Sequence, residues 1–423
     1  MGEYWTFLQG PVYEGLYPTK WYNEDPFDSG ELGAILNYLR LVGGVQLRQA
    51  RVANDSCSER RFLDDCITNA AGVCEPRFDS IDGSCFAEFT INRQDTEPFG
   101  PPEDPDRYTW SDGHTDMQGL FNFGPDYGTG GYVYNLPLDP AAASANLTQL
   151  FTDRWTDRGT RASMVSFNLY NTNTKLMSTV RILLEFFSSG HVVRSFKFFT
   201  IKLVVYQSRI DTLRLVGEFI FLAFWLYYLQ KEVRTIVYHR PFVLYFTKFR
   251  NLFEISFLGF IFAVVIAWLR FITDPLKVTS NFTVRATEFV DMFPLAEKYM
   301  TVYTLAGFIG LMACLKVFKF LAISKKMNAL WLTLARAAPD LLAFILGFVV
   351  LVGGFAFMAS MLFGFQLVDF HNFLASFSTL LRFPLGDFDY DALQIARPEI
   401  TGVFFTCYVG MVFLVCMNMI IGV

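Results

Sequence analysis

Five long runs of apolar residues dominate the second half of the chain. A helix that crosses a bilayer needs about 20 mostly apolar residues, and each of these runs carries at most one acid. Five such runs within about 210 residues are atypical of the buried helices of a soluble protein. We therefore predict five membrane-spanning helices. They cover residues 213–230, 251–269, 299–315, 341–368 and 400–423.

The first half of the chain follows another pattern. Residues 164–170 and 180–186 alternate apolar and polar side chains, which is typical of half-buried β-strands. Turns rich in Gly, Asp and Pro separate such segments, and residues 95–131 have the composition of a long loop. The chain is thus expected to begin with a strand-containing domain, which we place at residues 1–210.

The charge distribution predicts how the spans are oriented. Residues 1–210 hold 18 Lys and Arg against 26 Asp and Glu, whereas residues 211–423 hold 17 against 14. Short cytoplasmic loops carry an excess of Lys and Arg, so the two basic linkers should be cytoplasmic and the acidic first domain should lie outside. The basic residues are Lys231, Arg234, Arg240, Lys248 and Arg250 in one linker, and Lys316, Lys319, Lys325, Lys326 and Arg336 in the other.

Composition excludes several classes of protein. Of the 423 residues, 52% are hydrophobic and 18% are charged, 47 are Phe, and the mean hydropathy is +0.31. These values do not fit a disordered chain, a basic nucleic-acid binder or a disulfide-rich miniprotein. The sequence contains no Walker loop, HExxH or GxSxG motif. We expect membrane lipids around the protein, and no enzyme activity, required cofactor or nucleic-acid partner.

Four cysteines cluster in the first domain. Cys57, Cys66, Cys74 and Cys85 lie within 29 residues, and clustered cysteines in an acidic exterior domain indicate one or two disulfides. Three pairings are possible. A zinc site is the alternative, but the cluster has no CxxC pair and His114 is the only histidine among the first 190 residues.

Three sequons support the same orientation. Asn54, Asn146 and Asn281 each begin an Asn-x-Ser/Thr acceptor sequence, and all three lie in segments predicted to be outside. N-glycans are therefore expected. No signal peptide precedes the first domain, which suggests that a transmembrane helix upstream exports it.

Several ionisable residues lie within or at the end of the predicted spans. Lys316 and Lys319 are three residues apart and share one helix face, while Glu218 and Glu254 are the acids embedded in the first two spans. Pairing of the lysines with these acids would make a weak voltage sensor, since one charge crossing the full field is worth about 2.3 kcal/mol per 100 mV. The alternative is that the lysines only extend to the membrane interface.

The segment between the last two spans has the arrangement of a pore. Residues 370–383 are amphipathic but too short to cross, and a Pro-Leu-Gly-Asp turn at 384–387 and a short acidic segment at 389–396 follow. Irregular backbone at membrane depth is tolerated where it lines water. A ring of Asp387 side chains would then gather cations at the mouth. An ordinary extracellular loop is the alternative.

Several segments together resemble the polycystins of the transient-receptor-potential channel superfamily, most closely the polycystin-2 type. The similarity extends along nearly the whole chain, and the segment at 155–161 is the most specific. The segments are YWTFLQG at 4–10, EGLY at 14–17, RQARVANDSC at 48–57, WTDRGTR at 155–161, VRILLEF at 180–186, LKVFKF at 315–320, LGD at 385–387, and Asn418 with Met419.

The resemblance implies an α-helical multi-pass membrane protein with voltage-sensor-like helices, a pore domain and an extracellular α+β polycystin domain. The five spans would be the second to sixth helices, with the first helix absent from the chain. Four chains would form a homotetramer, or a heteromer with a polycystin-1-type subunit. The implied parts are a lid domain at 1–210, sensor-like helices at 211–326, a linker at 327–340 and the pore domain at 341–423.

The resemblance also implies residue roles. Leu385, Gly386 and Asp387 would form the selectivity filter, with Asp387 a transient site for permeating Ca²⁺, and Ile421 with Asn418 the lower gate. The sensor-like charges would be Lys316, Lys319, Glu254 and Glu218, and Cys57 would pair with Cys66.

The function implied is a calcium-permeable, nonselective cation channel that conducts Ca²⁺, Na⁺ and K⁺ in a ciliary or flagellar membrane, the plasma membrane or the endoplasmic reticulum. One alternative is a non-conducting polycystin-1-like subunit; the uncharged last span and Asp387 favour conduction. A mucolipin-like endolysosomal channel is the other, but that family lacks the 155–161 signature.

Overall fold

The computed structural model describes most of the chain. The chain divides into two compact units, Met1–Leu311 and Met312–Val423. The described residues leave out 1, 22, 28–32, 36–37, 55, 57–85, 115–116, 118–124, 189, 207, 239–244, 248, 275–287, 322–324 and 423, and also the side chains of 249–250, 318–321, 325–328, 330–331, 334–335, 413 and 416–422.

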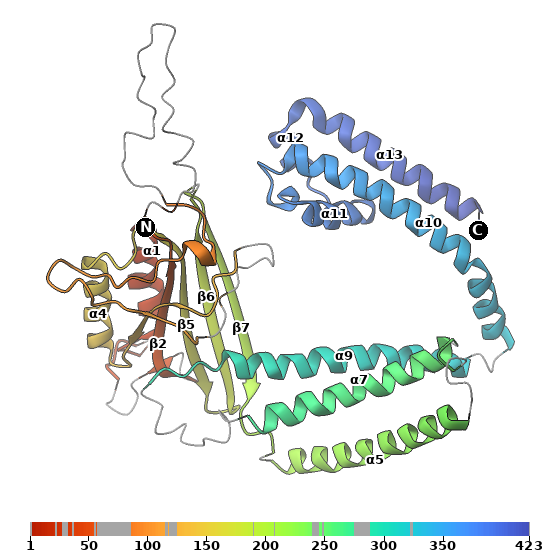
Figure 1. Ribbon diagram of the computed structural model, residues 1–423, viewed down its shortest axis with the longest axis horizontal. Coiled ribbons are helices and arrows are strands. Elements are labelled where there is room, and N and C mark those ends of the chain that lie inside the picture. Colours follow the sequence, from red (N-terminus) through yellow and green to blue (C-terminus); the bar gives the residue numbers. More distant parts are fainter. Residues whose placement is uncertain are drawn as a thin grey trace, which may run out of the picture. The chain divides into compact units, whose positions relative to one another are not determined.

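A seven-stranded antiparallel sheet forms the centre of the first unit, in the order β3-β4-β2-β5-β6-β7 with β1 paired to β2 (Figure 1). The predicted strands at 164–170 and 180–186 lie within β5 and β6. The strands are β1 Ala34–Ile35, β2 Leu39–Arg51, β3 Trp110–Ser111, β4 Gly131–Leu136, β5 Thr160–Asn171, β6 Leu176–Phe186 and β7 Val192–Lys202.

Short helices pack on the sheet and form its main core. Tyr4, Trp5 and Leu8 are buried in one cluster with Leu47 and Val165 of the sheet. Burial of aromatic and aliphatic side chains of this size is the main favourable term in folding. The helical segments are α1 Gly2–Phe7, the π-helix η1 Leu8–Val12, α2 Tyr13–Leu16, the 3₁₀-helix η3 Ile91–Arg93 and α4 Pro140–Thr152.

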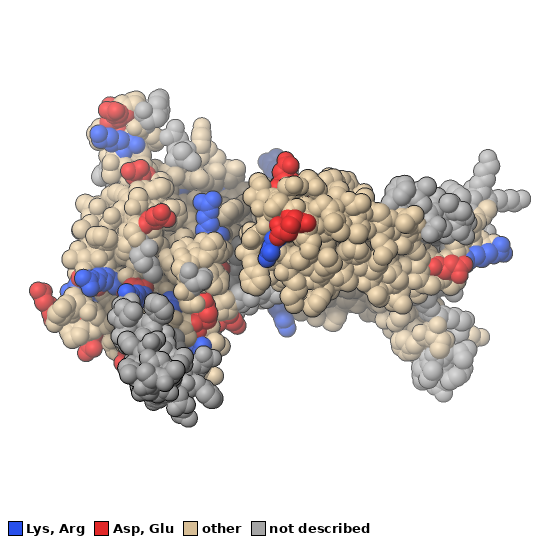
Figure 2. Space-filling view, turned by 90° about the horizontal axis from the view of Figure 1, so that it is seen from above, with Lys and Arg blue, Asp and Glu red and all other residues tan. Residues whose placement is uncertain are grey.

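Three long apolar helices follow the sheet: α5 Arg209–Tyr238, α7 Phe249–Ile272 and α9 Phe293–Leu321. Each contains one of the first three predicted spans. α5 contacts α7 through Trp225, whose indole N–H donates to the Leu258 carbonyl at 3.1 Å. The face seen in Figure 2 includes a broad area without Lys, Arg, Asp or Glu.

The second unit contains two long helices, α10 Lys325–Phe363 and α13 Pro398–Gly422, that lie side by side (Figure 1). Their core includes Val352, Phe363, Phe404 and Tyr408. The segment between them forms short elements. These are η4 Val368–Phe370, α11 Phe373–Arg382, η5 Phe383–Leu385 and α12 Tyr390–Ala396.

Among the described residues, four helices are long and apolar enough to cross a membrane: Arg209–Tyr238, Asn251–Ile272, Phe293–Val317 and Arg336–Phe363. The fifth predicted span corresponds to α13, whose described apolar part is Pro398–Val412. A strand-containing domain followed by membrane helices is thus confirmed.

The segment predicted as a linker, 327–340, belongs to the same helix as the fourth span. α10 runs through it with Pro339 inside, and its ribbon bends along its length (Figure 1). Proline removes one helical hydrogen bond and commonly bends a helix without ending it. An apolar run therefore marks the part of a helix that suits lipid, and the helix itself extends further.

Candidate functional site

The short helix α11 is fixed at both ends between α10 and α13. Its first turn is capped by Asn372, whose side-chain oxygen accepts from the Ala375 N–H at 2.7 Å. Near its end, the Tyr408 hydroxyl of α13 donates to the Leu380 carbonyl at 2.6 Å in a buried position. Phe383, which follows α11, is also buried against aromatic neighbours. The position where α11 ends is therefore set by packing.

A tight turn follows α11 and presents the predicted filter residues. Gly386 has φ +90°, a left-handed conformation that favours glycine, and its N–H donates to the Phe383 carbonyl at 2.9 Å. The Asp387 N–H donates to the Arg382 carbonyl at 3.3 Å. The side chains of Leu385 and Asp387 on either side of the glycine are exposed. The turn thus places the Asp387 carboxylate at the surface.

Arg382, the last residue of α11, was not identified from the sequence. Its Nη1 lies 3.0 Å from Oδ2 of Asp387, and its Nη2 donates to the Thr379 hydroxyl at 3.3 Å. A cation is favourable at a helix C-terminus because the last carbonyls carry partial negative charge. The available signal was a basic residue at the end of an amphipathic helix, directly before the predicted filter.

The turn presents oxygen atoms of a kind that hard cations prefer. Carboxylate and carbonyl oxygens are the ligands that Ca²⁺ and alkali ions prefer. Within the described ranges, no group of three or more His, Cys, Asp or Glu side chains is placed to hold a metal ion.

A second cluster of polar contacts joins the sheet to the segment that leads into α9. Nη2 of Arg181, on β6, lies 2.6 Å from Oδ2 of Asp291, and its guanidinium carbon lies 3.7 Å from the centre of the Phe293 ring. The Arg181 side chain is 7% exposed and that of Asp291 is 30% exposed. Asn168 of β5 donates to the Val290 carbonyl at 2.8 Å. We call these contacts the sheet–helix junction.

A bulge in β2 lets the junction segment approach closely. The register of β2 against β5 shifts between Val42 and Val45, and Gly43 in this bulge has φ +78°. A Cβ atom at Gly43 would lie 2.3 Å from the Glu288 carbonyl oxygen. Glycine is therefore required at this position both by backbone conformation and by space.

Further contacts extend the junction to the other two helices. Nζ of Lys202, at the end of β7, lies 2.8 Å from Asp211 of α5, and Nζ of Lys298 of α9 lies 2.5 Å from Asp274, just after α7. An apolar cluster that includes Met177 of the sheet and Phe271 of α7 fills the space beside them. The sheet therefore contacts the start of α5, the end of α7 and the segment that leads into α9.

The predicted sensor-like charges occupy separate positions. Glu218 accepts from the Tyr206 hydroxyl at 2.6 Å and from Nε of Arg214 at 2.9 Å, one turn earlier on α5. Glu254 lies half-buried on α7 and Lys316 half-buried on α9. The structure thus provides Glu218 with a local basic partner, and the sensor role of these residues stays a prediction.

Several predicted site residues lie outside the described residues in whole or in part. Cys57, Cys66, Cys74, Cys85 and Asn281 are not described. For Lys319, Asn418 and Ile421 the helix is described but the side chains are not. Of the predicted glycan acceptors, Asn54 is exposed in a turn and Asn146 is half-buried on α4.

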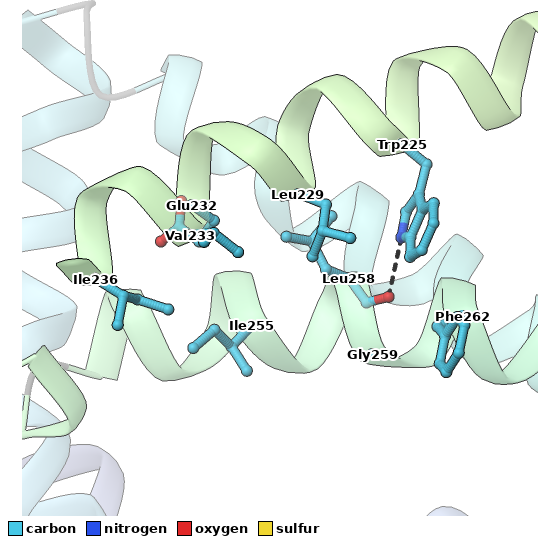
Figure 3. A pocket seen from close by; sticks show the side chains of 9 residues that line it. All are labelled: Trp225, Leu229, Glu232, Val233, Ile236, Ile255, Leu258, Gly259 and Phe262. Atoms are coloured by element: carbon cyan, nitrogen blue, oxygen red, sulfur yellow. Dashed lines mark hydrogen bonds between the residues drawn. The ribbon is translucent and has the colours of Figure 1, made fainter. Parts of the chain in front are cut away.

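One hollow between α5 and α7 has a volume of about 360 Å³ and is lined almost wholly by apolar side chains (Figure 3). Trp225 and Phe262 stack near one end, with ring centres 5.8 Å apart. Glu232 is the one charged residue that lines it, and its carboxylate accepts from the Tyr245 hydroxyl. This lining suits hydrocarbon and offers no group for covalent chemistry.

Comparison with protein families matches both halves of the chain. Residues 1–204 match the Polycystin domain, and residues 205–423 match the Polycystin cation channel family. The second match alone covers more than half of the chain.

Individual relatives agree with these matches over the full chain. Polycystin-2 of Danio rerio is 30% identical over 426 residues, which cover 100% of this chain and 45% of that protein. Polycystin-2-like protein 1 of Homo sapiens is 29% identical over 100% of this chain and 50% of that protein. Polycystin-2 of Caenorhabditis elegans is 31% identical over 100% of this chain and 56% of that protein. The chain spans about half the length of these relatives. It belongs to the polycystin cation channel family.

Proposed function

We propose that the chain forms the membrane part and lid of a tetrameric, calcium-permeable, nonselective cation channel of the polycystin-2 type. The observation that supports this most directly is the turn after α11. A short helix fixed between two long apolar helices ends in a glycine turn that exposes the carboxylate of Asp387. Four copies around an axis would place four such carboxylates at one entrance, where they would attract cations.

In this proposal each part of the chain has a separate role. Residues 1–210 form the extracellular or luminal lid, 211–326 the sensor-like helices, 327–340 the linker and 341–423 the pore domain. The roles rest on the family and on the positions of the matching residues. The filter is Leu385, Gly386 and Asp387, the lower gate is Ile421 with Asn418, and the sensor-like charges are Lys316, Lys319, Glu254 and Glu218.

The surroundings of the channel follow from the same proposal. Na⁺, K⁺ and Ca²⁺ are the permeating ions, lipids surround the helices, and N-glycans attach to Asn54, Asn146 and Asn281. The cysteines between 57 and 85 form the disulfides. A ciliary or flagellar membrane, the plasma membrane or the endoplasmic reticulum is the location, and a polycystin-1-type subunit is a partner. Polycystin-1-like protein 3 of Mus musculus is 25% identical over 62% of this chain.

Reconstitution of the purified protein in a planar bilayer, with Ca²⁺ on one side and K⁺ on the other, tests this proposal. We expect a cation current, and Asp387→Asn should lower the Ca²⁺-to-monovalent permeability ratio because the ring loses its charge. Asp391→Asn is the matched control, since Asp391 is an exposed acid of the nearby helix α12. Absence of current would favour a non-conducting subunit, and an unchanged ratio in Asp387→Asn would remove this residue from the filter.

A further inference from the structure

We propose that Arg382 is a tethered counter-ion of the filter carboxylate and sets how strongly the channel prefers divalent over monovalent cations. This inference rests on the proposed channel function. It concerns a residue outside the proposed filter, which the resemblance to the family did not point to.

The geometry of Arg382 supports a counter-ion role. Its guanidinium lies 3.0 Å from the Asp387 carboxylate and is also bound to the Thr379 hydroxyl at 3.3 Å. The Thr379 hydroxyl in turn donates to the Asp369 carbonyl at 3.2 Å. This second hydrogen bond holds in place the hydroxyl that accepts from the guanidinium. A guanidinium stays charged at every physiological pH. A positive charge is therefore held permanently beside the acid that an entering ion would meet.

The turn does not depend on this ion pair for its shape. The side chain of Arg382 is 49% exposed and that of Asp387 is 67% exposed, and ion pairs exposed to this degree contribute little to stability. The backbone of the turn is held by the Gly386 N–H, which donates to the Phe383 carbonyl, and α11 is held by Tyr408. Removal of the guanidinium should therefore change the charge at the turn and preserve the fold.

The charge of the passing ion explains why the effect is selective. Coulomb attraction scales with the product of the charges, so partial neutralisation of Asp387 weakens the attraction for Ca²⁺ twice as much as that for Na⁺. In addition, Ca²⁺ that binds the carboxylate must compete with a guanidinium that cannot diffuse away. Arg382 would thus keep the channel nonselective even though the channel carries a ring of Asp387 carboxylates.

Arg382→Gln tests the inference in the reconstituted full chain. We expect the Ca²⁺-to-Na⁺ permeability ratio, measured from reversal potentials, to rise about two- to fivefold, the range that corresponds to an exposed ion pair. Arg382→Lys should stay near the unmodified protein because it keeps the charge. Arg397→Gln is the matched control, since Arg397 is 45% exposed and lies 3.6 Å from Glu399.

A second variant covers the case in which Arg382→Gln does not reach the membrane. In Arg382→His the side-chain charge can be switched on or off by a change of pH in the same purified protein, because histidine titrates near pH 6.5. The permeability ratio should then be higher at pH 8 than at pH 5.5 by more than in the unmodified protein. An equal pH dependence in the two proteins would overturn the inference.

The Asp387→Asn background separates this inference from the proposed function. If Asp387→Asn lowers the ratio but Arg382→Gln leaves it unchanged, Asp387 stays in the filter and the counter-ion role is wrong. Once Asp387→Asn is present, Arg382→Gln should have no further effect on the ratio, and an undiminished rise would show that the arginine acts without the pair. An unchanged ratio in Asp387→Asn alone would instead refute the filter assignment.

Discussion

The ion pair between Arg181 and Asp291 provides the sharpest test of the sheet–helix junction. It links β6 to the start of α9 across 110 residues of sequence, and it combines a 2.6 Å charged hydrogen bond with a guanidinium over the Phe293 ring. Arg181→Gln removes both contacts, while Asp291→Asn removes only the first. The Oδ1 atom of Asp291 also accepts from the Phe293 N–H at 3.0 Å, a cap that asparagine can replace.

The burial of the two side chains determines how much unfolding free energy each variant loses. Removal of one member of a buried ion pair costs about 3–5 kcal/mol, because the other charge is left without compensation. After Arg181→Gln, the remaining Asp291 is 30% exposed and regains water, so we expect a smaller loss of about 2–3 kcal/mol, which includes the contact with the ring. After Asp291→Asn, the remaining Arg181 is only 7% exposed. The loss should then be about 3–4 kcal/mol.

Thermal unfolding of the purified chain in detergent, followed by the circular dichroism of the sheet, measures these losses. A domain of this size shifts its midpoint by about 2–4 °C per kcal/mol, so Asp291→Asn should lower the midpoint by about 6–16 °C and Arg181→Gln by somewhat less. Arg194→Gln is the control, since Arg194 is an exposed residue of the neighbouring strand β7.

The relative size of the two losses is the critical result. If Arg181→Gln costs more than Asp291→Asn, the loss follows packing of the arginine stem rather than loss of the charge pair. If both variants unfold at the midpoint of the Arg194 control, the junction does not couple the sheet to α9. In a double-mutant cycle the two losses should be clearly less than additive.

Three further predictions concern other contacts. Gly43→Ala should destabilise the chain by at least about 1 kcal/mol more than Gly113→Ala in thermal melts, because both glycines have positive φ but only the first faces backbone within 4 Å. Tyr408→Phe should cost about 1 kcal/mol in the same assay, because it removes one of the two donors to the buried Leu380 carbonyl and leaves only the Phe383 N–H; a loss under about 0.3 kcal/mol would mean that this hydrogen bond does not hold α11. Joint neutralisation of Lys316 and Lys319 should shift the voltage of half activation, whereas an unshifted curve at equal surface expression would support interfacial lysines.

The membrane helices could be predicted from sequence because lipid imposes one local rule. A span must be apolar over about 20 residues, so its existence can be recognised without knowledge of its neighbours. The ends of the helices could not be read in this way. α10 begins at Lys325, well before the apolar run, because polar residues outside the hydrocarbon can continue a helix as well as end it.

The two charged contacts were missed for different reasons. Arg181 fits the alternation of side chains along β6 as any other strand residue would. Its partner Asp291 is 110 residues away, so no local sequence pattern relates the two. Arg382 and Asp387 are only five residues apart, but a left-handed glycine lies between them. Helix or strand periodicity cannot predict a contact across such a turn.

Burial distinguishes what these two ion pairs can do. In the pair at the junction the Arg181 side chain is only 7% exposed. The low dielectric of its surroundings strengthens its attraction to Asp291 and makes loss of either partner costly. The pair at the turn leaves Asp387 67% exposed, so it adds little stability, but its charge remains accessible to ions in water. The same pair of side-chain types therefore serves to hold two elements together in one place and to adjust an electric field in the other. A substitution at Arg382 should consequently change permeation with little change in the unfolding midpoint, and one at Arg181 should lower the midpoint.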